Sequence, residues 1–434
     1  MGKNRHKQNK KMSQSLQWHR LDNTANLFPV IVSENVSNVY RVSVTLKEQI
    51  NPEILQKALD KVLPFFKVFS SKLKKGIFWY YFETNTKSSP RVIMENSLPC
   101  QYINPYANNE YQFRVTYYEK RINLEVFHAL TDGNGALAFL KEITYQYLRY
   151  CHEELMEQCT DTLSPNLSLD KVDGYIKNYK SKAKKNYNTK KAYVFKGEKF
   201  DKGIFGIIHG YMNLKQVKQV AKEHNVTINQ YLLGVYAWAV YKACFNQKPC
   251  KNAFSVCVPV NLRPYFETET TKNFFTVVSA IFESKRDDYT FDEVLAQIAA
   301  SLNEQINKEN LEKMFSYNVA SEKNMLIRVV PVFVKNLVMK YIYKTSARAN
   351  STTVTNLGLI KVADEYKDYI DKFHIVLSIS KGQYVKGGVC SFDNVLVFTF
   401  SSVIRDTSLQ REFFRKISED GIEVSIESNG VYYE

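Results

Sequence analysis

The sequence predicts an α/β protein with two similar halves, and three observations lead to this prediction. Stretches with the alternating pattern of half-buried strands are followed by stretches with the 3.6-residue pattern of amphipathic helices. The 434 residues, of which 44% are hydrophobic, suffice for two or three domains with their own cores and are unlike a disordered chain. A Lys-rich segment, residues 176–196, divides the two sets of elements.

A strand and an amphipathic helix open the first half. Residues 39–46 alternate in polarity like a half-buried strand. Asn51-Pro52 then begins a helix whose apolar side chains recur on one face as far as Leu63. The other elements expected in this half are strands at residues 76–82, 113–118 and 122–127 and a helix at about residues 134–150.

The second half repeats the same kinds of element. Residues 228–244 are apolar almost all round, which predicts a buried helix. Residues 326–343 predict a helix with Pro331 near its start, where a proline opens or kinks a helix. The other expected elements are helices at residues 215–224, at 291–307 and after 406, and strands at residues 254–260, 273–282, 373–378, 384–392 and 395–400.

These patterns divide the chain into four parts. Residues 1–18 are a basic tail that we expect to be disordered, and residues 19–175 form the N-terminal half. Residues 176–196 are a linker that crosses to the C-terminal half, residues 197–434. The linker has eight lysines, no acidic residue and little periodicity, so a solvated segment explains it better than the alternative, a nucleic-acid-binding stripe.

The net charge of +15 suits nucleic acid, an anionic membrane or an anionic small substrate, although a Lys-rich coding background would give the same excess. The seven cysteines form no Cys-x-x-Cys pair, so we expect no metal site and reduced thiols. No apolar stretch is long enough to span a membrane, and the basic N-terminus leads into no secretory apolar region. The sequence therefore predicts a soluble, cytoplasmic protein.

One segment, residues 122–135, combines side chains suited to catalysis. Its pattern places His128 at the inward-facing end of a strand and Asp132 where the chain becomes helical, with Gly133 allowing a tight turn. An imidazole accepts a proton near neutral pH if one ring nitrogen is held toward the substrate. A buried Asp132 needs a cationic partner, because an unpaired buried charge is costly. The alternative is that His128 is a core histidine and Asp132 only caps a helix.

Residues 128–133, His-Ala-Leu-Thr-Asp-Gly, resemble the His-x-x-x-Asp-Gly signature of the chloramphenicol-acetyltransferase-like acyltransferases. Residues 258–264, which contain Arg263, resemble the arginine-bearing strand in the second half of these enzymes, and residues 355–358 resemble a later strand end. The family includes alcohol acetyltransferases, polyketide-associated and plant acyltransferases, and the condensation domains of peptide synthetases. The order of elements matches over nearly the whole chain.

The resemblance implies two similar domains, each a two-layer α+β sandwich, with the active site in a channel between them. It makes His128 the general base, which takes a proton from an acceptor hydroxyl or amine during attack on a thioester. It implies no metal and no covalent enzyme intermediate. Asp132, Gly133 and Arg263 become structural supports of the active site, with Arg263 as the partner of Asp132.

The resemblance also implies the substrates. Acyl-CoA is the expected co-substrate, no cofactor is bound permanently, and the acceptor is a small alcohol or amine. The phosphates of coenzyme A would suit the basic chain. Because residues 355–358 resemble a segment of the family, Thr355 and Asn356 are candidates for a donor to the oxyanion or for the wall of the channel. The alternative for Asn356 is that it is only a turn residue before Gly358.

Two departures from the family pattern limit which branch of the family the chain can resemble. Phe127 precedes His128 where condensation domains have two adjacent histidines, and the terminal Asp-Phe-Gly-Trp-Gly motif of the plant branch is missing. The bacterial alcohol-acetyltransferase-like group is nearest in character. Three alternatives stay open: an acyl donor on a carrier protein, a non-catalytic binding module, and surface binding through residues 176–196 or 326–344. We expect no nucleic-acid partner, and a peripheral membrane contact stays open.

Overall fold

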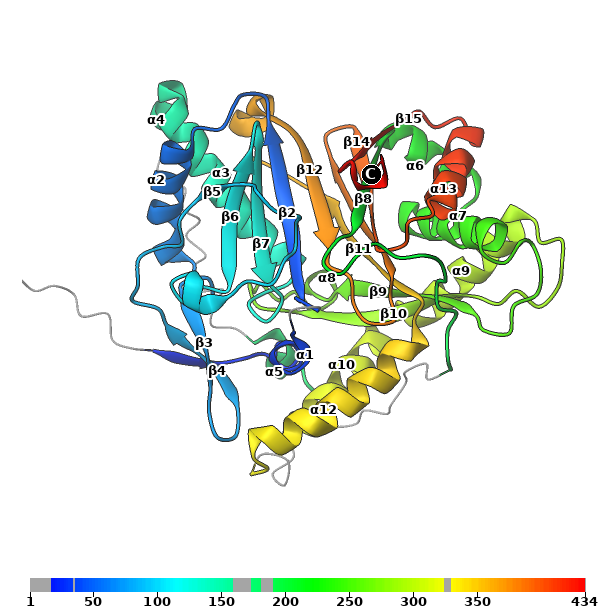
Figure 1. Ribbon diagram of the computed structural model, residues 1–434, viewed down its shortest axis with the longest axis horizontal. Coiled ribbons are helices and arrows are strands. Elements are labelled where there is room, and N and C mark those ends of the chain that lie inside the picture. Colours follow the sequence, from blue (N-terminus) through cyan, green and yellow to red (C-terminus); the bar gives the residue numbers. More distant parts are fainter. Residues whose placement is uncertain (1–16, 34–35, 159–172, 181–189, 324–328, 434) are drawn as a thin grey trace, which may run out of the picture.

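The computed structural model describes residues 17–33, 36–158, 173–180, 190–323 and 329–433. Two lobes lie side by side, each a sheet covered by helices (Figure 1). Each lobe has a large hydrophobic core of its own. A smaller apolar cluster, which includes Val39, Cys100, Phe205 and Val376, packs where the lobes meet. The α/β class expected from the sequence is confirmed.

The N-terminal lobe is built on a five-stranded sheet with the order β12-β2-β7-β6-β5. Its strands are β2 (Val39–Leu46), β5 (Ile93–Met94), β6 (Phe113–Tyr118), β7 (Arg121–Phe127) and β12 (Ile370–Leu377). Two helices cover one face of this sheet, α2 (Pro52–Val62) and α3 (Gly133–Cys151). Helix α2 begins where the sequence predicts, because the Asn51 side chain accepts hydrogen bonds from two backbone N–H groups of its first turn.

The C-terminal lobe is built on a seven-stranded sheet with the order β10-β9-β11-β13-β14-β8-β15. Its strands are β8 (Gly206–Asn213), β9 (Phe254–Asn261), β10 (Phe275–Phe282), β11 (Thr352–Leu359), β13 (Val385–Phe392), β14 (Val395–Ser402) and β15 (Val424–Ser428). Its main helices are α6 (Leu214–Glu223), α7 (Ile228–Ala243), α9 (Phe291–Gln305) and α13 (Ser408–Glu419). Helix α7 is buried almost all round, as its apolar composition predicts.

Strand β12 comes from the second half of the chain but belongs to the sheet of the N-terminal lobe. It pairs with β2 in antiparallel register, with Phe373 opposite Val44 and Leu377 opposite Tyr40. Figure 1 shows β12 between β2 and the strands of the other lobe. The first lobe is therefore completed by a strand from the far end of the chain, and the division at residues 175 and 197 does not describe the sheets by itself.

The smaller elements surround the two lobes. Strands β1 (Trp18–Arg20), β4 (Tyr80–Thr84) and β3 (Ser71–Lys75) form a separate sheet in that order. Within the described residues, the remaining α-helices are α1 (Phe28–Ile31), α4 (Glu153–Gln158), α5 (Gly174–Lys177), α8 (Arg263–Phe266), α10 (Lys308–Lys323) and α12 (Val332–Ser346). Short 3-10 turns lie at Leu63–Phe65, Pro105–Ala107, Ala347–Ala349, Asp364–Tyr369 and Val431–Tyr433. No helix of the described residues is long and apolar enough to cross a membrane.

Several expected boundaries differ from those of the structure. Trp18, expected in the tail, already pairs with Glu83 in a sheet, while residues 1–16 lie outside the described part. Residues 181–189 of the expected linker lie outside it as well. The helix expected from residue 326 begins only after Pro331, which stands at its N-cap.

Candidate active site

His128 directly follows strand β7 and lies between the two lobes. Its backbone N–H donates to the carbonyl of Asn38, at 3.0 Å, which fixes the chain as it leaves the sheet. The imidazole stacks on the ring of Phe28, with centroids 4.3 Å apart, and lies 5.0 Å from the ring of Tyr40. Phe275, on β10 of the other lobe, lies 5.9 Å away. Aromatic rings from both lobes therefore hold the imidazole in place.

The environment of His128 keeps its ring uncharged near neutral pH. The residue is half-buried, and Nδ1 is buried without a hydrogen-bond partner among the described residues. Burial lowers the pKa of His128 below its ordinary value of 6.5, and the positive charge of Lys386 lowers it further. Three interactions oppose this shift and raise the pKa: a polar interaction with the backbone of His128 itself, the negative charge of Asp132, and a polar interaction with the Asn273 side chain.

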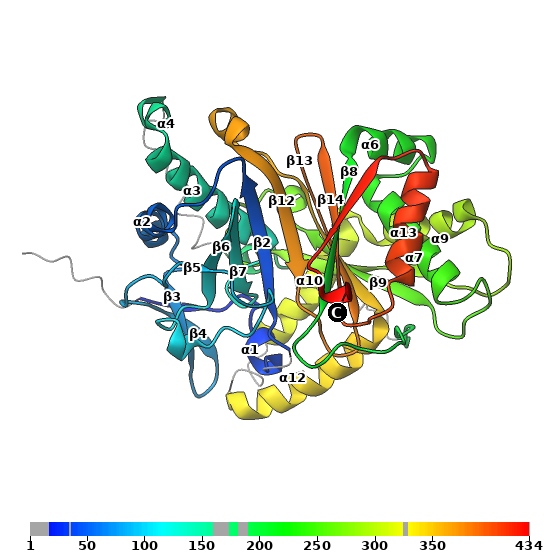
Figure 2. The same ribbon diagram turned by 45° about the horizontal axis from the view of Figure 1, so that its top comes forward.

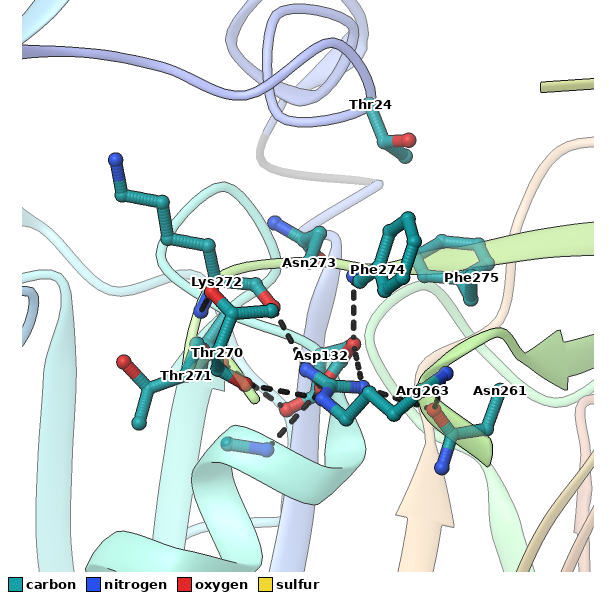
Figure 3. Close-up of polar contacts among 12 residues, drawn as sticks. Thr24, Asp132, Asn261, Arg263, Thr270, Thr271, Lys272, Asn273, Phe274 and Phe275 are labelled. Carbon is teal, nitrogen blue, oxygen red and sulfur yellow. Dashed lines mark hydrogen bonds and ion pairs between the residues drawn. The ribbon is translucent and has the colours of Figure 1, made fainter. Parts of the chain in front are cut away.

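Asp132 caps helix α3 and has both carboxylate oxygens occupied. Oδ1 accepts from the backbone N–H of Gly135 at 3.1 Å, and Oδ2 accepts from that of Phe274 at 3.0 Å. The Arg263 guanidinium donates to both oxygens, at 3.1 and 2.9 Å (Figure 3). The ion pair expected from the sequence is thus present, and it joins the two lobes. Such a fully occupied carboxylate positions other groups and has no oxygen left for a substrate.

Arg263 uses all five of its N–H groups, as Figure 3 shows. Besides Asp132, it donates to the Asn261 side chain at 3.1 Å and to the carbonyls of Thr270 and Lys272 at 2.9 and 2.7 Å. The loop that follows α8 is therefore tied to the start of α3. One guanidinium holds the turn after His128 and the facing loop of the other lobe in one arrangement.

Close contacts explain the two glycines of the turn. A Cβ on Gly133 would lie 2.7 Å from the Leu357 side chain at the end of β11. A Cβ on Gly135 would lie 1.9 Å from the Thr131 hydroxyl and 2.4 Å from the carbonyl of Thr271. The Leu357 side chain near Gly133 is flexible and could move, whereas the Thr271 carbonyl near Gly135 belongs to the backbone. Glycine is therefore required more strictly at position 135, which the motif does not contain.

Strand β11 places Thr355 and Asn356 on opposite faces of the sheet. The Asn356 amide donates to Asn229, at the start of α7, at 3.2 Å and accepts from the backbone N–H of Gly358 at 2.7 Å. Thr355 pairs with Gly388, which lies against Ile375 of β12, and Ile375 is also a neighbour of Gly133. Thr355 thus faces the motif and Asn356 faces the helix layer. An oxyanion role is a prediction better suited to Thr355.

Lys386, on β13, belongs to the same region and is missed by the sequence reasoning. Along one face of β13, the Cys390 thiol donates to the carbonyl of Phe373, and Gly388 lies against Ile375. The next residue on this face is Lys386, which lies beside the last residues of β12. Leu377, at that end of β12, pairs with Tyr40, and Tyr40 contacts His128. The signal available in the sequence was a lone charged residue within a mostly apolar strand.

The ammonium of Lys386 forms no ion pair with any carboxylate of the described residues. Burial lowers its pKa to about 8. Its charge acts on the thiols of Cys100 and Cys257 as well as on His128. A cation without a carboxylate partner therefore lies near the imidazole.

A buried acid, Asp22, lies behind the motif and is also missed by the sequence reasoning. Its carboxylate accepts from the Asn273 side chain at 2.9 Å and from the backbone N–H of Ala25 at 2.8 Å. Burial raises the pKa of Asp22 to about 7. Asp22 and Leu130 line a small hollow of about 20 Å³. Four basic residues line the same hollow: His19, Arg20, Lys67 and Lys272.

No protein-family model matches the sequence, and no curated protein matches it. Solved structures do match its fold. Polyketide synthase associated protein 5 from Mycobacterium tuberculosis is 13% identical, with a TM-score of 0.56 over 92% of this chain and 96% of its own. TRI101 of F. graminearum, complexed with coenzyme A and T-2 mycotoxin, is 9% identical, with a TM-score of 0.63 over 94% and 99%.

A third match is the wax ester synthase/diacylglycerol acyltransferase from Marinobacter aquaeolei VT8. It is 11% identical, with a TM-score of 0.52 over 93% of this chain and 100% of its own. The matches cover 92% to 94% of this chain and so extend over both lobes. The chain therefore has the chloramphenicol-acetyltransferase-like acyltransferase fold over almost its whole length.

Proposed function

We propose that the protein is an acyltransferase that moves an acyl group from an acyl-CoA thioester to an alcohol or amine. His128 is the general base, and no covalent enzyme intermediate forms. The observation that carries the proposal is the state of His128: an imidazole kept neutral by burial and held by aromatic rings from both lobes. The fixed Asp132–Arg263 pair beside it suits a site that must hold one geometry.

The reaction needs one proton transfer in each direction. Nε2 of His128 takes the proton of the acceptor O–H or N–H as that atom attacks the thioester carbonyl carbon. The tetrahedral intermediate then expels the thiolate of coenzyme A, which takes the proton back from the imidazolium. General base catalysis of this kind contributes about 10²- to 10⁴-fold. A donor such as the Thr355 hydroxyl would stabilise the carbonyl oxygen as it gains negative charge.

Coenzyme A is the proposed carrier of the acyl group because proteins of similar fold bind it. TRI101 is complexed with coenzyme A, and a mutant starter condensation domain of rhizomide synthetase is complexed with C8-CoA and Leu-SNAC. The second candidate function is the same transfer from a carrier protein, which the condensation-domain likeness and the net charge of +15 favour. A non-catalytic binding module is the third, and His128 with its paired Asp132 argues against it.

The test is turnover with a panel of acyl-CoAs and of alcohols or amines, followed by the release of free thiol. His128→Ala is expected to lose at least about 10²-fold in rate, with an unchanged melting temperature. His224→Ala is the matched control, because His224 contacts Asp292 at the surface of the other lobe and should keep full activity. Unchanged thiol release in His128→Ala would overturn the proposal. Turnover only with acyl-carrier protein would favour the second candidate.

A further inference from the structure

Helix α12 and the neighbouring turn between β3 and β4 expose a continuous set of large apolar side chains, here called the α12 surface. Each of its six residues is more than half exposed, from 53% to 74%. They are Ile77, Phe333, Leu337, Val338, Tyr341 and Ile342. Large exposed apolar patches mark sites of interaction with proteins or membranes.

Hydrogen bonds tie the two parts of this surface together. The backbone N–H of Val332 donates to the carbonyl of Ile77 at 2.8 Å, and the Lys335 ammonium donates to that of Phe78 at 3.1 Å. Lys335 also lies 3.5 Å from the ring centre of Trp79. Figures 1 and 2 show α12 along one outer edge of the molecule, with the β3–β4 turn beside its beginning. The surface is therefore built on a fixed junction.

The helix turns its apolar side outward. Phe333, Leu337 and Tyr341 are spaced four residues apart, so they lie in one row on the exposed face. Of the residues of α12, Val332 alone is fully buried. An ordinary surface helix has the opposite arrangement, with its apolar row on the core. The exposed row therefore contributes little to the packing of the described residues.

Charge identifies what the α12 surface meets. Helix α12 contains Lys335, Lys340 and Lys344 and no acidic residue, and the turn between β3 and β4 contains none either. Lys340 and Lys344 are exposed and lie one turn apart, at the side of the apolar row. Apolar and aromatic residues beside lysines on one exposed face are the features of a helix that lies in the interface of an anionic membrane.

We infer that the α12 surface docks on an anionic phospholipid membrane. The row of Phe333, Leu337 and Tyr341 enters the boundary between headgroups and acyl chains, and Lys340 and Lys344 meet the phosphates. The protein stays peripheral, because none of its described helices can cross the bilayer. A second copy of the chain fits less well, because two α12 surfaces would bring their lysines together without acidic partners.

The experiment is co-sedimentation of the full chain with vesicles of phosphatidylcholine alone and of phosphatidylcholine mixed with phosphatidylglycerol. We expect binding to the mixed vesicles that weakens as salt is added, and weak binding to phosphatidylcholine alone. The double variant Lys340→Glu with Lys344→Glu should bind the mixed vesicles at least about 25-fold more weakly, since each lysine contributes about fivefold. Phe333→Ser with Leu337→Ser should lose about tenfold or more at any salt concentration.

Tyr106→Ser is the matched control, because it removes an aromatic side chain that is 90% exposed but lies outside the α12 surface. It should bind like the parent chain, and all variants should keep their melting temperature. Equal sedimentation with and without phosphatidylglycerol, or unchanged binding by both double variants, would overturn the inference. So would light scattering that shows a dimer which Phe333→Ser with Leu337→Ser dissociates, or salt-sensitive capture of an acidic carrier protein in place of vesicles.

Discussion

At the scale of single residues, the two polar groups of the motif have opposite surroundings. His128 has a buried Nδ1 with no hydrogen-bond partner in the described part of the chain, whereas both oxygens of Asp132 are occupied by Arg263 and by backbone N–H groups. The same short segment therefore supplies one reactive group and one fixed support. The stability of the protein should depend more on Asp132 than on His128.

Asp132→Ala should destabilise the protein strongly. It leaves the Arg263 guanidinium partly buried without its carboxylate, and breaking such a pair costs about 3 to 5 kcal/mol. Urea unfolding measures the change. Glu309→Ala, which removes an exposed pair with Lys313, is the control and should leave stability unchanged. If the two variants unfold at the same urea concentration, the Asp132–Arg263 pair does not support the fold.

Lys386→Met should move the pH dependence of activity. Protonation of His128 removes the base, so kcat/KM falls as the pH falls, and the lowered pKa of His128 places this fall below pH 6.5. Loss of the Lys386 charge removes one cause of the lowering, so the fall should shift to higher pH. Lys372→Met is the control, because Lys372 lowers the pKa of His209 and His374 instead. A shift to lower pH would contradict the placement of Lys386.

Asp22→Asn should change how stability depends on pH. The pKa of Asp22 is about 7 in the folded chain against 3.8 in the unfolded chain, so only the folded chain holds this proton between those values. Its contribution to stability is present below about pH 4 and is lost as the pH rises toward 7. Relative to the parent, the variant should gain up to about 4 kcal/mol between pH 4 and 8. Thermal unfolding across this range tests it, and a pH-independent difference would contradict it.

At the scale of elements, helices could be predicted better than strands. Asn51-Pro52 marks the start of α2, and the apolar composition of α7 predicts its burial. Strand β8 was not predicted, because Gly206 and Gly210 interrupt its apolar pattern. The structure explains both glycines, since a Cβ at either would overlap an aromatic ring, of Tyr432 or of Phe414. Those rings come from the far end of the chain, so no local pattern reveals them.

Gly133→Ala and Gly135→Ala form a matched pair at the start of α3. At position 135 a methyl group meets the Thr271 carbonyl, so we expect a loss of about 1 to 3 kcal/mol or more and a large loss of activity. At position 133 it meets only the flexible end of Leu357, and the gain in helix propensity offsets the contact. Urea unfolding and thiol release measure both. Equal effects would mean that the turn adapts to either methyl group.

At the scale of the whole molecule, the candidate site residues could be predicted from the sequence, but several residues that surround them could not. The pairing of Asp132 with Arg263 follows from the resemblance of two short segments, and the structure contains it. Lys386 and Asn273 approach His128 only because sheets and loops of both lobes meet there. Such contacts depend on strand order and on the angle between lobes, which hydrophobic periodicity does not encode.

The passage of β12 into the first sheet has a consequence for how a cell makes this protein. A ribosome releases β2 and β7 long before it synthesises residues 370–377, so the nascent N-terminal lobe carries an open sheet edge while the rest is translated. The edge of β2 can close only after residues 370–377 have left the ribosome. Until then the unpaired edge of β2 is open to pairing with other chains, so protection of this edge matters most during synthesis of the second lobe.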